Sequence, residues 1–292
     1  MRQKQQACPF TVLTLFCVIF SASAPAQEPD SAINASRSDV GFLPSIDFRP
    51  LIADPREPQL GGSLRAGDFA QRGLEAIASI GSTFGLFGFT AQGGRSTVQI
   101  GGSGGVFARF DLHARGNIVS EDYEIALPVY FTSGSFGARV RMFHRSAHVG
   151  DEYAAVHPDF TRFDLSYEAI EAVLAKSFGG ARIYGGGDYQ VHNATTPIEP
   201  GTLRAGTDFV SRSSFGSGSL RGRWVAGVDL QASRDLSWRV AKSGVAGIQV
   251  TRAGTTLPSL RILAELFSGP SNAGQFYGKK EKYIGLAGYI TR

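Results

Sequence analysis

The sequence predicts an all-β protein, a closed antiparallel transmembrane β-barrel of about twelve strands. Apolar and polar residues alternate with a period of two along most of the chain beyond residue 59, which is typical of strands with two different faces. Beyond the amino-terminal segment, no stretch is apolar for long enough to form a transmembrane helix. Mean hydropathy is close to zero, as expected when each strand shows lipid one face only.

The first 26 residues predict a signal peptide. Arg2 and Lys4 form a positive start, residues 7–20 are apolar and uncharged, and residues 24–26 match the small-x-small cleavage pattern. The apolar run is shorter than the roughly 20 residues that a membrane-spanning helix needs. We therefore expect export through the Sec pathway, removal of this segment and a final location in the bacterial outer membrane.

Composition limits the partners of the exported chain. Both cysteines, Cys8 and Cys17, lie in the predicted signal peptide, so no disulfide partner is expected. Loss of Arg2 and Lys4 lowers the formal net charge from +4 to +2, and no basic run occurs, so no nucleic-acid partner is expected. The expected partner is outer-membrane lipid.

Two segments precede the predicted barrel. Residues 27–41 are mostly small and polar, which predicts a flexible linker. Residues 42–58 hold four of the 13 prolines together with too many apolar side chains for a free tail. We expect this Pro-rich part to be an ordered extended segment that plugs or braces the barrel. The barrel itself is predicted over residues 59–292.

The alternation assigns a face to each side chain of a strand. Ile125 and Leu127, for example, are predicted to face lipid, and the residues between and beside them to face the lumen. Opposite charges on the inward face would compensate one another. The charged residues assigned to the lumen are Arg109, Asp122, Glu124, Arg139 and Arg141. The strands are predicted near residues 59–68, 73–90, 96–113, 119–132, 136–149, 160–177, 181–192, 202–211, 221–233, 236–252, 258–268 and 281–291.

The strand near residues 160–177 is assigned by the same rule. Its apolar residues are predicted to face lipid, and these are Phe163, Leu165, Tyr167 and Ala169. Its polar residues are predicted to face inward, and these are Arg162, Asp164, Ser166 and Glu168.

One short motif suggests chemistry. His144, Ser146 and His148 are spaced by two, so a strand would place all three on the face of Val140 and Met142, which is assigned to lipid. An imidazole beside a hydroxyl can take the hydroxyl proton as the oxygen attacks an ester. Ser146 is therefore a candidate nucleophile and His144 a candidate base of a lipid hydrolase.

The His-x-Ser spacing resembles that of outer-membrane phospholipase A and of lipid A deacylase, both barrels with an external His-Ser site. The resemblance covers this motif and the general architecture. In those enzymes an Asn or Glu on the neighbouring strand orients the histidine. The neighbouring outward positions here, Thr161 and Phe163, offer no such group, so a third member is left unassigned.

The motif has alternative interpretations. His144, Ser146 and His148 would also serve as polar rim residues that hydrogen-bond the loop at 149–159. A β-bulge near the motif, at position 143 or 145, would instead turn them inward. They would then join a polar cluster inside the barrel, formed with Asp164, Ser166 and Glu168.

The residues after the motif suggest a metal site. Asp151 and Glu152 are candidate calcium ligands, but no calcium-loop signature surrounds them. No other metal site and no cofactor are predicted.

Longer segments resemble the bacterial domain-of-unknown-function family 1207. The segments that match are residues 50–58, 144–153 and 166–168, with 274–276 and 283–286 near the end of the chain. This resemblance implies an envelope β-barrel and brings no activity with it. It implies that the characteristic features of the family include His144, Ser146, His148, Asp151 and Glu152.

Three functions are compatible with the sequence, and whether the chain is an enzyme is left open. The first is an integral outer-membrane barrel with a structural or narrow-pore role. The second is a lipid esterase that uses Ser146 and His144. The third is a soluble periplasmic β-protein, which would leave the membrane fraction on carbonate washing.

Overall fold

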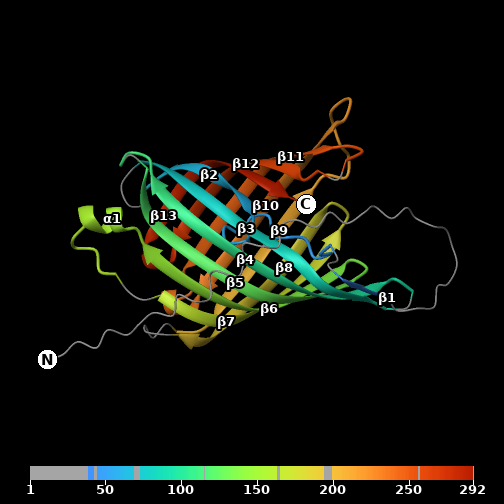
Figure 1. The fold of residues 1–292 in the computed structure, drawn as a ribbon, viewed down its shortest axis with the longest axis horizontal. Coiled ribbons are helices and arrows are strands. Elements are labelled where there is room, and N and C mark those ends of the chain that lie inside the picture. Colours follow the sequence, from blue (N-terminus) through green and yellow to red (C-terminus); the bar gives the residue numbers. More distant parts are fainter. Residues whose placement is uncertain are drawn as a thin grey trace. The chain divides into compact units, whose positions relative to one another are not determined.

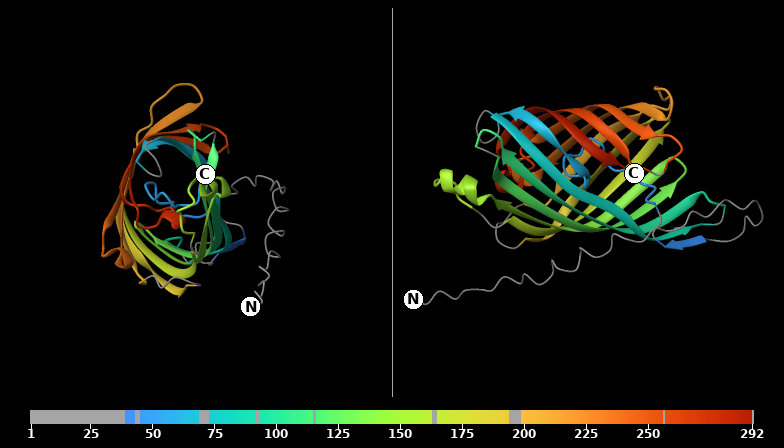
Figure 2. Two further views of the ribbon diagram at one scale, coloured as in Figure 1. Left: turned by 90° about the vertical axis from the view of Figure 1, so that its left-hand side faces the viewer. Right: turned by 45° about the horizontal axis from the view of Figure 1, so that its top comes forward.

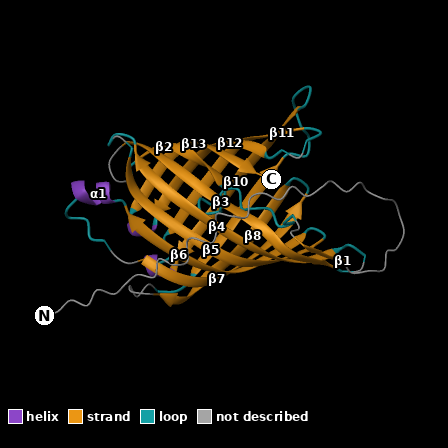
Figure 3. Cartoon of the chain, viewed as in Figure 1, coloured by secondary structure: helices purple, strands orange, loops and turns teal. Residues whose placement is uncertain are grey.

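The computed structural model describes residues 39–42, 45–68, 73–91, 93–114, 116–162, 165–193, 199–255 and 257–291. The predicted signal peptide lies outside these residues, as do most of the predicted linker, Phe163 and Asp164. Most of the described chain is strand (Figure 3). No helix among the described residues is long and apolar enough to cross a membrane.

Twelve of the strands form one closed antiparallel barrel (Figure 1). Each strand from β2 to β13 pairs with its neighbours in sequence, and β13 pairs with β2 to close the ring. The strands are β1 (Asp39–Phe42), β2 (Leu60–Gly67), β3 (Gly73–Thr90), β4 (Ser96–Asp111), β5 (Asn117–Ser133), β6 (Phe136–Val149), β7 (Leu165–Phe178), β8 (Ala181–Asn193), β9 (Thr202–Val210), β10 (Leu220–Ser233), β11 (Val240–Arg252), β12 (Ser259–Pro270) and β13 (Lys280–Thr291). The short helical elements are α1 (Asp151–Val156), η2 (Arg234–Leu236) and η3 (Gly274–Phe276). The predicted fold class is confirmed.

Most strand boundaries agree with the prediction to within three residues, and two begin later. The strand predicted from 236 begins at Val240 because η2 and a tight turn occupy the preceding residues. In that turn Ser237 and Trp238 have φ values of 53° and 60°, which no strand residue adopts. The strand predicted from 160 begins at Leu165 among the described residues, and residues 157–162, which follow α1, form no strand.

The two faces of the central strands are those expected of a barrel in lipid. On β5, Leu127 is 66% exposed, whereas Asp122 on the opposite face is 2% exposed. On β6, Val140 and Met142 are exposed, and Arg141 is buried. Apolar side chains therefore cover the outside of these strands, and charged side chains lie within.

The faces predicted for β7 are wrong. Leu165, Tyr167 and Ala169 are buried inside the barrel, and the exposed residues of this strand include Ile170 and Leu174. The prediction assumed a polar lumen, whereas Leu165, Tyr167 and Ala169 pack inside the barrel in a cluster with other apolar side chains, such as Phe143 and Ala147. At these positions an apolar side chain therefore has apolar surroundings on the inner face as well as on the outer face. The corrected faces also move Ser166 and Glu168 to the outer surface.

Residues 45–59 run through the interior of the barrel, in the place expected of a plug (Figure 2, left). Phe48 and Leu51 are buried against Val173 of β7 and Tyr184 of β8. The charged residues of the segment pair with the barrel wall, and the pairs are Arg56 with Asp122, Glu57 with Arg139, and Asp54 with Arg204. Both apolar contacts and ion pairs thus hold this segment in the lumen.

The strand β1 lies where the sequence predicted flexible linker. It pairs with the far end of β3, with Val40 opposite Phe89. β3 has 18 residues and its neighbour β2 has 8, so part of one β3 edge has no partner in the barrel. An unpaired strand edge is a template for further pairing, and this explains why residues 39–42 are extended.

Candidate active site on the outer face of the barrel

The motif of β6 lies on a regular strand. The pairing of β6 with β5 runs without a shift from Ser133 opposite Phe136 to Ser120 opposite Val149. Its pairing with β7 is equally regular. A bulge that would turn the motif inward is therefore absent from β6, and this alternative is wrong. His144, Ser146 and His148 share the outer face with Met142.

Glu168 of β7 lies directly opposite His144 in the sheet. The side chain of His144 contacts it through a hydrogen bond of 2.8 Å between Nδ1 and Oε1. A carboxylate can only accept, so Nδ1 carries the proton and Nε2 is the nitrogen that is free to act as a base. The structure thus brings a third residue to the pair named by the motif.

Ser146 is next to this pair on the same face. Residues two apart on a strand are separated by about 6.6 Å, a span that an imidazole ring and a serine side chain can bridge. In the sheet Ser146 is opposite Ser166 of β7 and Tyr123 of β5. Ser166 is therefore a polar neighbour of Ser146 on the outer surface and does not belong to an internal cluster.

The sequence contained a signal for Glu168 that the assignment of faces overlooked. Glu168 and Glu171 are three residues apart, so a regular strand must place one inside and one outside. Glu171 is nearer the middle of the strand, where a charge in lipid is costly. In the structure Glu171 is inside, paired with Arg139 and Arg141, and Glu168 is outside near the rim.

The site lies where the outer surface changes from apolar to polar. On the side toward the middle of the barrel, Met142 is opposite Leu127 and Ile170, and all three are exposed. On the side toward the rim, His148 is exposed and Glu121 accepts a hydrogen bond from Tyr123. This change marks the boundary between lipid and water on a membrane barrel.

The remaining residues of the motif region are not among the hydrogen-bond partners of the Glu168 carboxylate. His148 packs its ring edge-on against Tyr123, with ring centroids 5.9 Å apart. Asp151 and Glu152 are exposed on α1, and Asp151 pairs with Arg162 at 2.8 Å. Within the described ranges, no three histidine, cysteine or acidic side chains gather in a way that could hold a metal ion.

His192 of β8 also belongs to this cluster and was not among the residues expected from the sequence. Its Nδ1 lies 2.6 Å from Oε2 of Glu168. Each oxygen of the carboxylate therefore contacts one imidazole, His144 from β6 and His192 from β8.

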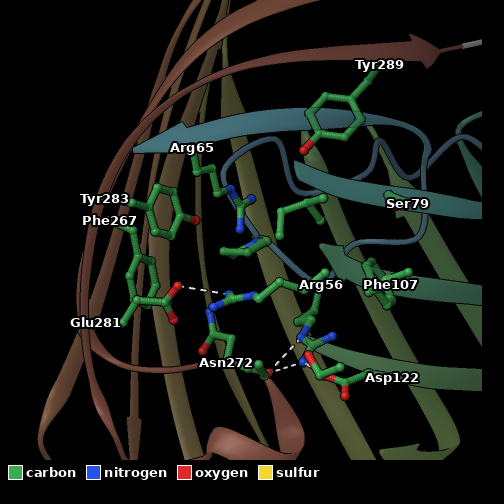
Figure 4. Close-up of a pocket in the computed structure, with 16 residues that line it drawn as sticks. Arg56, Arg65, Ser79, Phe107, Asp122, Phe267, Asn272, Glu281, Tyr283 and Tyr289 are labelled. Atoms are coloured by element: carbon green, nitrogen blue, oxygen red, sulfur yellow. Dashed lines mark hydrogen bonds and ion pairs between the residues drawn. The ribbon is translucent and has the colours of Figure 1, made fainter. Parts of the chain in front are cut away.

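The charged residues assigned to the lumen are buried there in ion pairs. Arg109 pairs with Glu281 at 2.9 Å, and Arg141 pairs with Glu124 at 2.7 Å and with Glu171 at 2.8 Å. Arg139 pairs with Glu171 as well as with the inner segment. A cavity of about 40 Å³ lies beside the Arg109–Glu281 pair and is also lined by Arg56 and Asp122 (Figure 4). A space of this size holds a few water molecules and no larger solute.

Comparison with solved structures finds outer-membrane phospholipases with a similar fold. Outer membrane phospholipase A from Escherichia coli is 12% identical, with a TM-score of 0.54 over 85% of this chain and 94% of that chain. The Salmonella typhi outer membrane phospholipase dimer with bound calcium is also 12% identical, with a TM-score of 0.52 over 82% and 94% of the two chains. LpxR from Salmonella typhimurium is 9% identical, with a TM-score of 0.36 over 80% and 100%.

At these identities the likeness concerns the fold alone, which is that of outer-membrane β-barrels. The search of curated proteins finds no match to this sequence. The model of the family described as protein of unknown function (DUF1207) matches residues 24–290. Because that match spans most of the sequence, this chain belongs to the DUF1207 family.

Proposed function

We propose that this protein is an outer-membrane hydrolase that cleaves ester-linked acyl chains from membrane lipids. Ser146 is the nucleophile, His144 the general base, and Glu168 the group that orients the histidine. The observation that supports this most strongly is the 2.8 Å hydrogen bond between His144 Nδ1 and Glu168 Oε1 across two strands, two residues from Ser146. A serine, a histidine and an acid in this order form the known arrangement for nucleophilic acyl transfer.

The chemistry follows from the protonation of His144. Its Nε2 accepts the Ser146 hydroxyl proton as Oγ bonds to the ester carbonyl carbon. The carbon–oxygen bond to the lipid alcohol then breaks, and that alcohol takes the proton from Nε2. In the second half, water attacks the acyl-serine ester and gives a proton to Nε2. The bond between the acyl carbon and Oγ then breaks, and Oγ takes that proton from Nε2, so that a fatty acid is released and the hydroxyl of Ser146 is restored. Glu168 stays ionised and stabilises the imidazolium in both halves.

The position of the site favours a lipid substrate. Exposed Leu127, Met142 and Ile170 adjoin it on one side, and they form a surface on which acyl chains can lie. Polar residues adjoin it on the other side, where a headgroup would meet water. An ester bond of a membrane lipid is located at that same boundary between chain and headgroup. The lipid would therefore reach Ser146 without leaving the membrane.

The fold is consistent with this activity. The solved structure described as outer membrane phospholipase A has the same barrel architecture as this chain. We further propose that residues 1–26 direct export through the Sec pathway and that the barrel inserts into the outer membrane. The exposed apolar side chains on the barrel strands support insertion, since large apolar surfaces are rare on soluble monomers.

Hydrolysis of phospholipid vesicles and of lipid A by the purified full-length barrel tests the proposal. Wild-type protein is expected to release fatty acid, measured by mass spectrometry, and Ser146→Ala to release none above the lipid-only background. Ser135→Ala, in the turn between β5 and β6, is the matched control and should retain the wild-type rate. Equal release by wild type and Ser146→Ala, or none by wild type on either lipid, would contradict the proposal.

A barrel with a structural role and no catalysis is the second candidate. The filled lumen favours it over a pore, because residues 45–59 and the buried ion pairs occupy the interior. The lipid assay separates the two candidates directly.

A further inference from the structure

We infer that His192 is a positioning residue of the proposed hydrolase, and that a β-bulge in β8 directs its side chain toward Glu168. This inference rests on the proposed function and extends the site from two strands to three. His192 touches neither the lipid ester nor Ser146 in this arrangement. It acts through Glu168, by holding the second oxygen of the carboxylate whose first oxygen holds His144.

The bulge is visible in the pairing of β7 with β8. Ala169 is opposite Gln190, but the preceding residue of β7, Glu168, is opposite His192 and not opposite Val191. One extra residue, Val191, therefore lies in β8 between the two pairs. Val191 and His192 are consecutive and both exposed, as expected where a bulge turns two successive side chains outward.

Without the extra residue, the position opposite Glu168 would be occupied by Val191. His192 would then be opposite Tyr167, on the inner face of the barrel. The bulge therefore decides whether an imidazole or an isopropyl group lies beside the carboxylate. Bulges are common next to active sites, where they redirect a side chain in this manner.

The physical need for a second partner follows from the exposure of Glu168. Its side chain is 29% exposed at the rim, and a glutamate side chain has considerable rotamer freedom. A single hydrogen bond to His144 would leave the carboxylate free to rotate and to exchange that bond for water. A second bond of 2.6 Å from β8 restricts the carboxylate to the orientation in which Oε1 faces His144.

Charge is consistent with a positioning role. The described residues that contact the Glu168 carboxylate are two histidines, with no lysine or arginine among its ion-pair partners. The inner carboxylate Glu171, by contrast, is paired with arginines. Imidazole N–H donors orient a carboxylate without the permanent charge of an arginine, which would oppose formation of the His144 imidazolium.

Two substitutions separate positioning from a merely structural role. His192→Ala removes the donor, and His192→Asn keeps a donor near the position of Nδ1, because the Asn amide nitrogen is at the same distance along the side chain. His113→Ala, in the exposed turn between β4 and β5, is the control for loss of a surface histidine. All are assayed as full-length barrels on the lipid cleaved by wild type, with thermal unfolding recorded by circular dichroism.

We expect His192→Ala to lower kcat about tenfold with KM within about twofold of wild type. His192→Asn should recover to within about threefold of the wild-type kcat, and His113→Ala should match wild type. Wild-type kcat in His192→Ala, or an equally low kcat in His192→Asn and His192→Ala with unchanged unfolding temperatures, would overturn the inference. If either outcome occurs while Ser146→Ala is inactive, the proposed function stands and only the role of His192 fails. A wild-type protein without hydrolysis would overturn both.

Discussion

Glu168 of β7 accepts a hydrogen bond from Nδ1 of His144 on β6, at 2.8 Å, between two residues that are directly opposite in the sheet. This relationship turns a two-residue motif into a three-residue site, and it lies on the surface that the barrel presents to lipid. It also ties the proposed function to the strand register, because a shift of one residue in β7 would move Glu168 to the lumen.

Replacing Glu168 by alanine should reduce the rate of hydrolysis more than replacing it by glutamine, which removes only the charge. Glu168→Ala leaves His144 Nδ1 without its acceptor, and we expect kcat to fall about 100-fold. Glu168→Gln keeps an oxygen acceptor but not the charge, and we expect a fall of about tenfold. Glu152→Gln, which changes an exposed acid on α1, is the control and should have wild-type kcat. An unchanged kcat in Glu168→Ala would contradict the role of this residue.

The outward face of β5 should not accept a charge near its middle. Leu127→Arg places a guanidinium where the side chain is 66% exposed between apolar neighbours, and we expect a loss of about 2–4 kcal/mol in the free energy of unfolding. Leu257→Arg, the same change in the turn before β12, should cost less than about 1 kcal/mol. Urea unfolding of the barrels in lipid vesicles measures both. Equal losses would show that Leu127 does not face lipid.

The ion pair between Arg139 and Glu57 should stabilise the inner segment within the barrel. Arg139→Met leaves Glu57 buried without its 2.7 Å partner, and we expect a loss of about 3 kcal/mol in the free energy of unfolding. Arg162→Met breaks the exposed pair with Asp151 and should cost less than about 1 kcal/mol. A small effect of Arg139→Met would mean that residues 45–59 leave the lumen in the membrane.

The filled lumen predicts that the barrel does not conduct ions. Residues 45–59 lie inside, and the cavity beside Arg56 has a volume of only about 40 Å³. Planar bilayers that contain purified protein should therefore show no stable channel steps. Reproducible steps of one size would contradict the packed interior.

The protein should also remain in the membrane fraction after carbonate washing, unlike a soluble periplasmic protein.

The barrel architecture could be predicted from the sequence because most strands alternate apolar residues on the outer face with polar residues on the inner face. On β5 and β6 the lumen contains paired charges, so polar residues are inside and the alternation of Arg139, Val140 and Arg141 gives their faces correctly. On β7 the same rule fails, since Val173 and Ala169 pack inside against other apolar residues. What fills a lumen is a property of the whole chain and cannot be inferred from the alternation within one strand.

The site was predictable in part. His144 and Ser146 were found because two residues on one strand reveal their common face through spacing alone. Glu168 required the face of a second strand, and the better evidence was its parity relative to Glu171. His192 required the position of a bulge, which depends on how β8 pairs with β7 and leaves no mark in the local sequence.

Covalent labelling tests the central claim most directly. A long-chain alkylsulfonyl fluoride added to wild-type protein in lipid vesicles should modify Ser146, as located by peptide mass spectrometry, because His144 activates this hydroxyl at the lipid-facing surface. Labelling should be lost in His144→Ala and strongly slowed in Glu168→Ala. An unmodified Ser146 in wild type, or equal labelling of Ser146 in wild type and His144→Ala, would contradict the account.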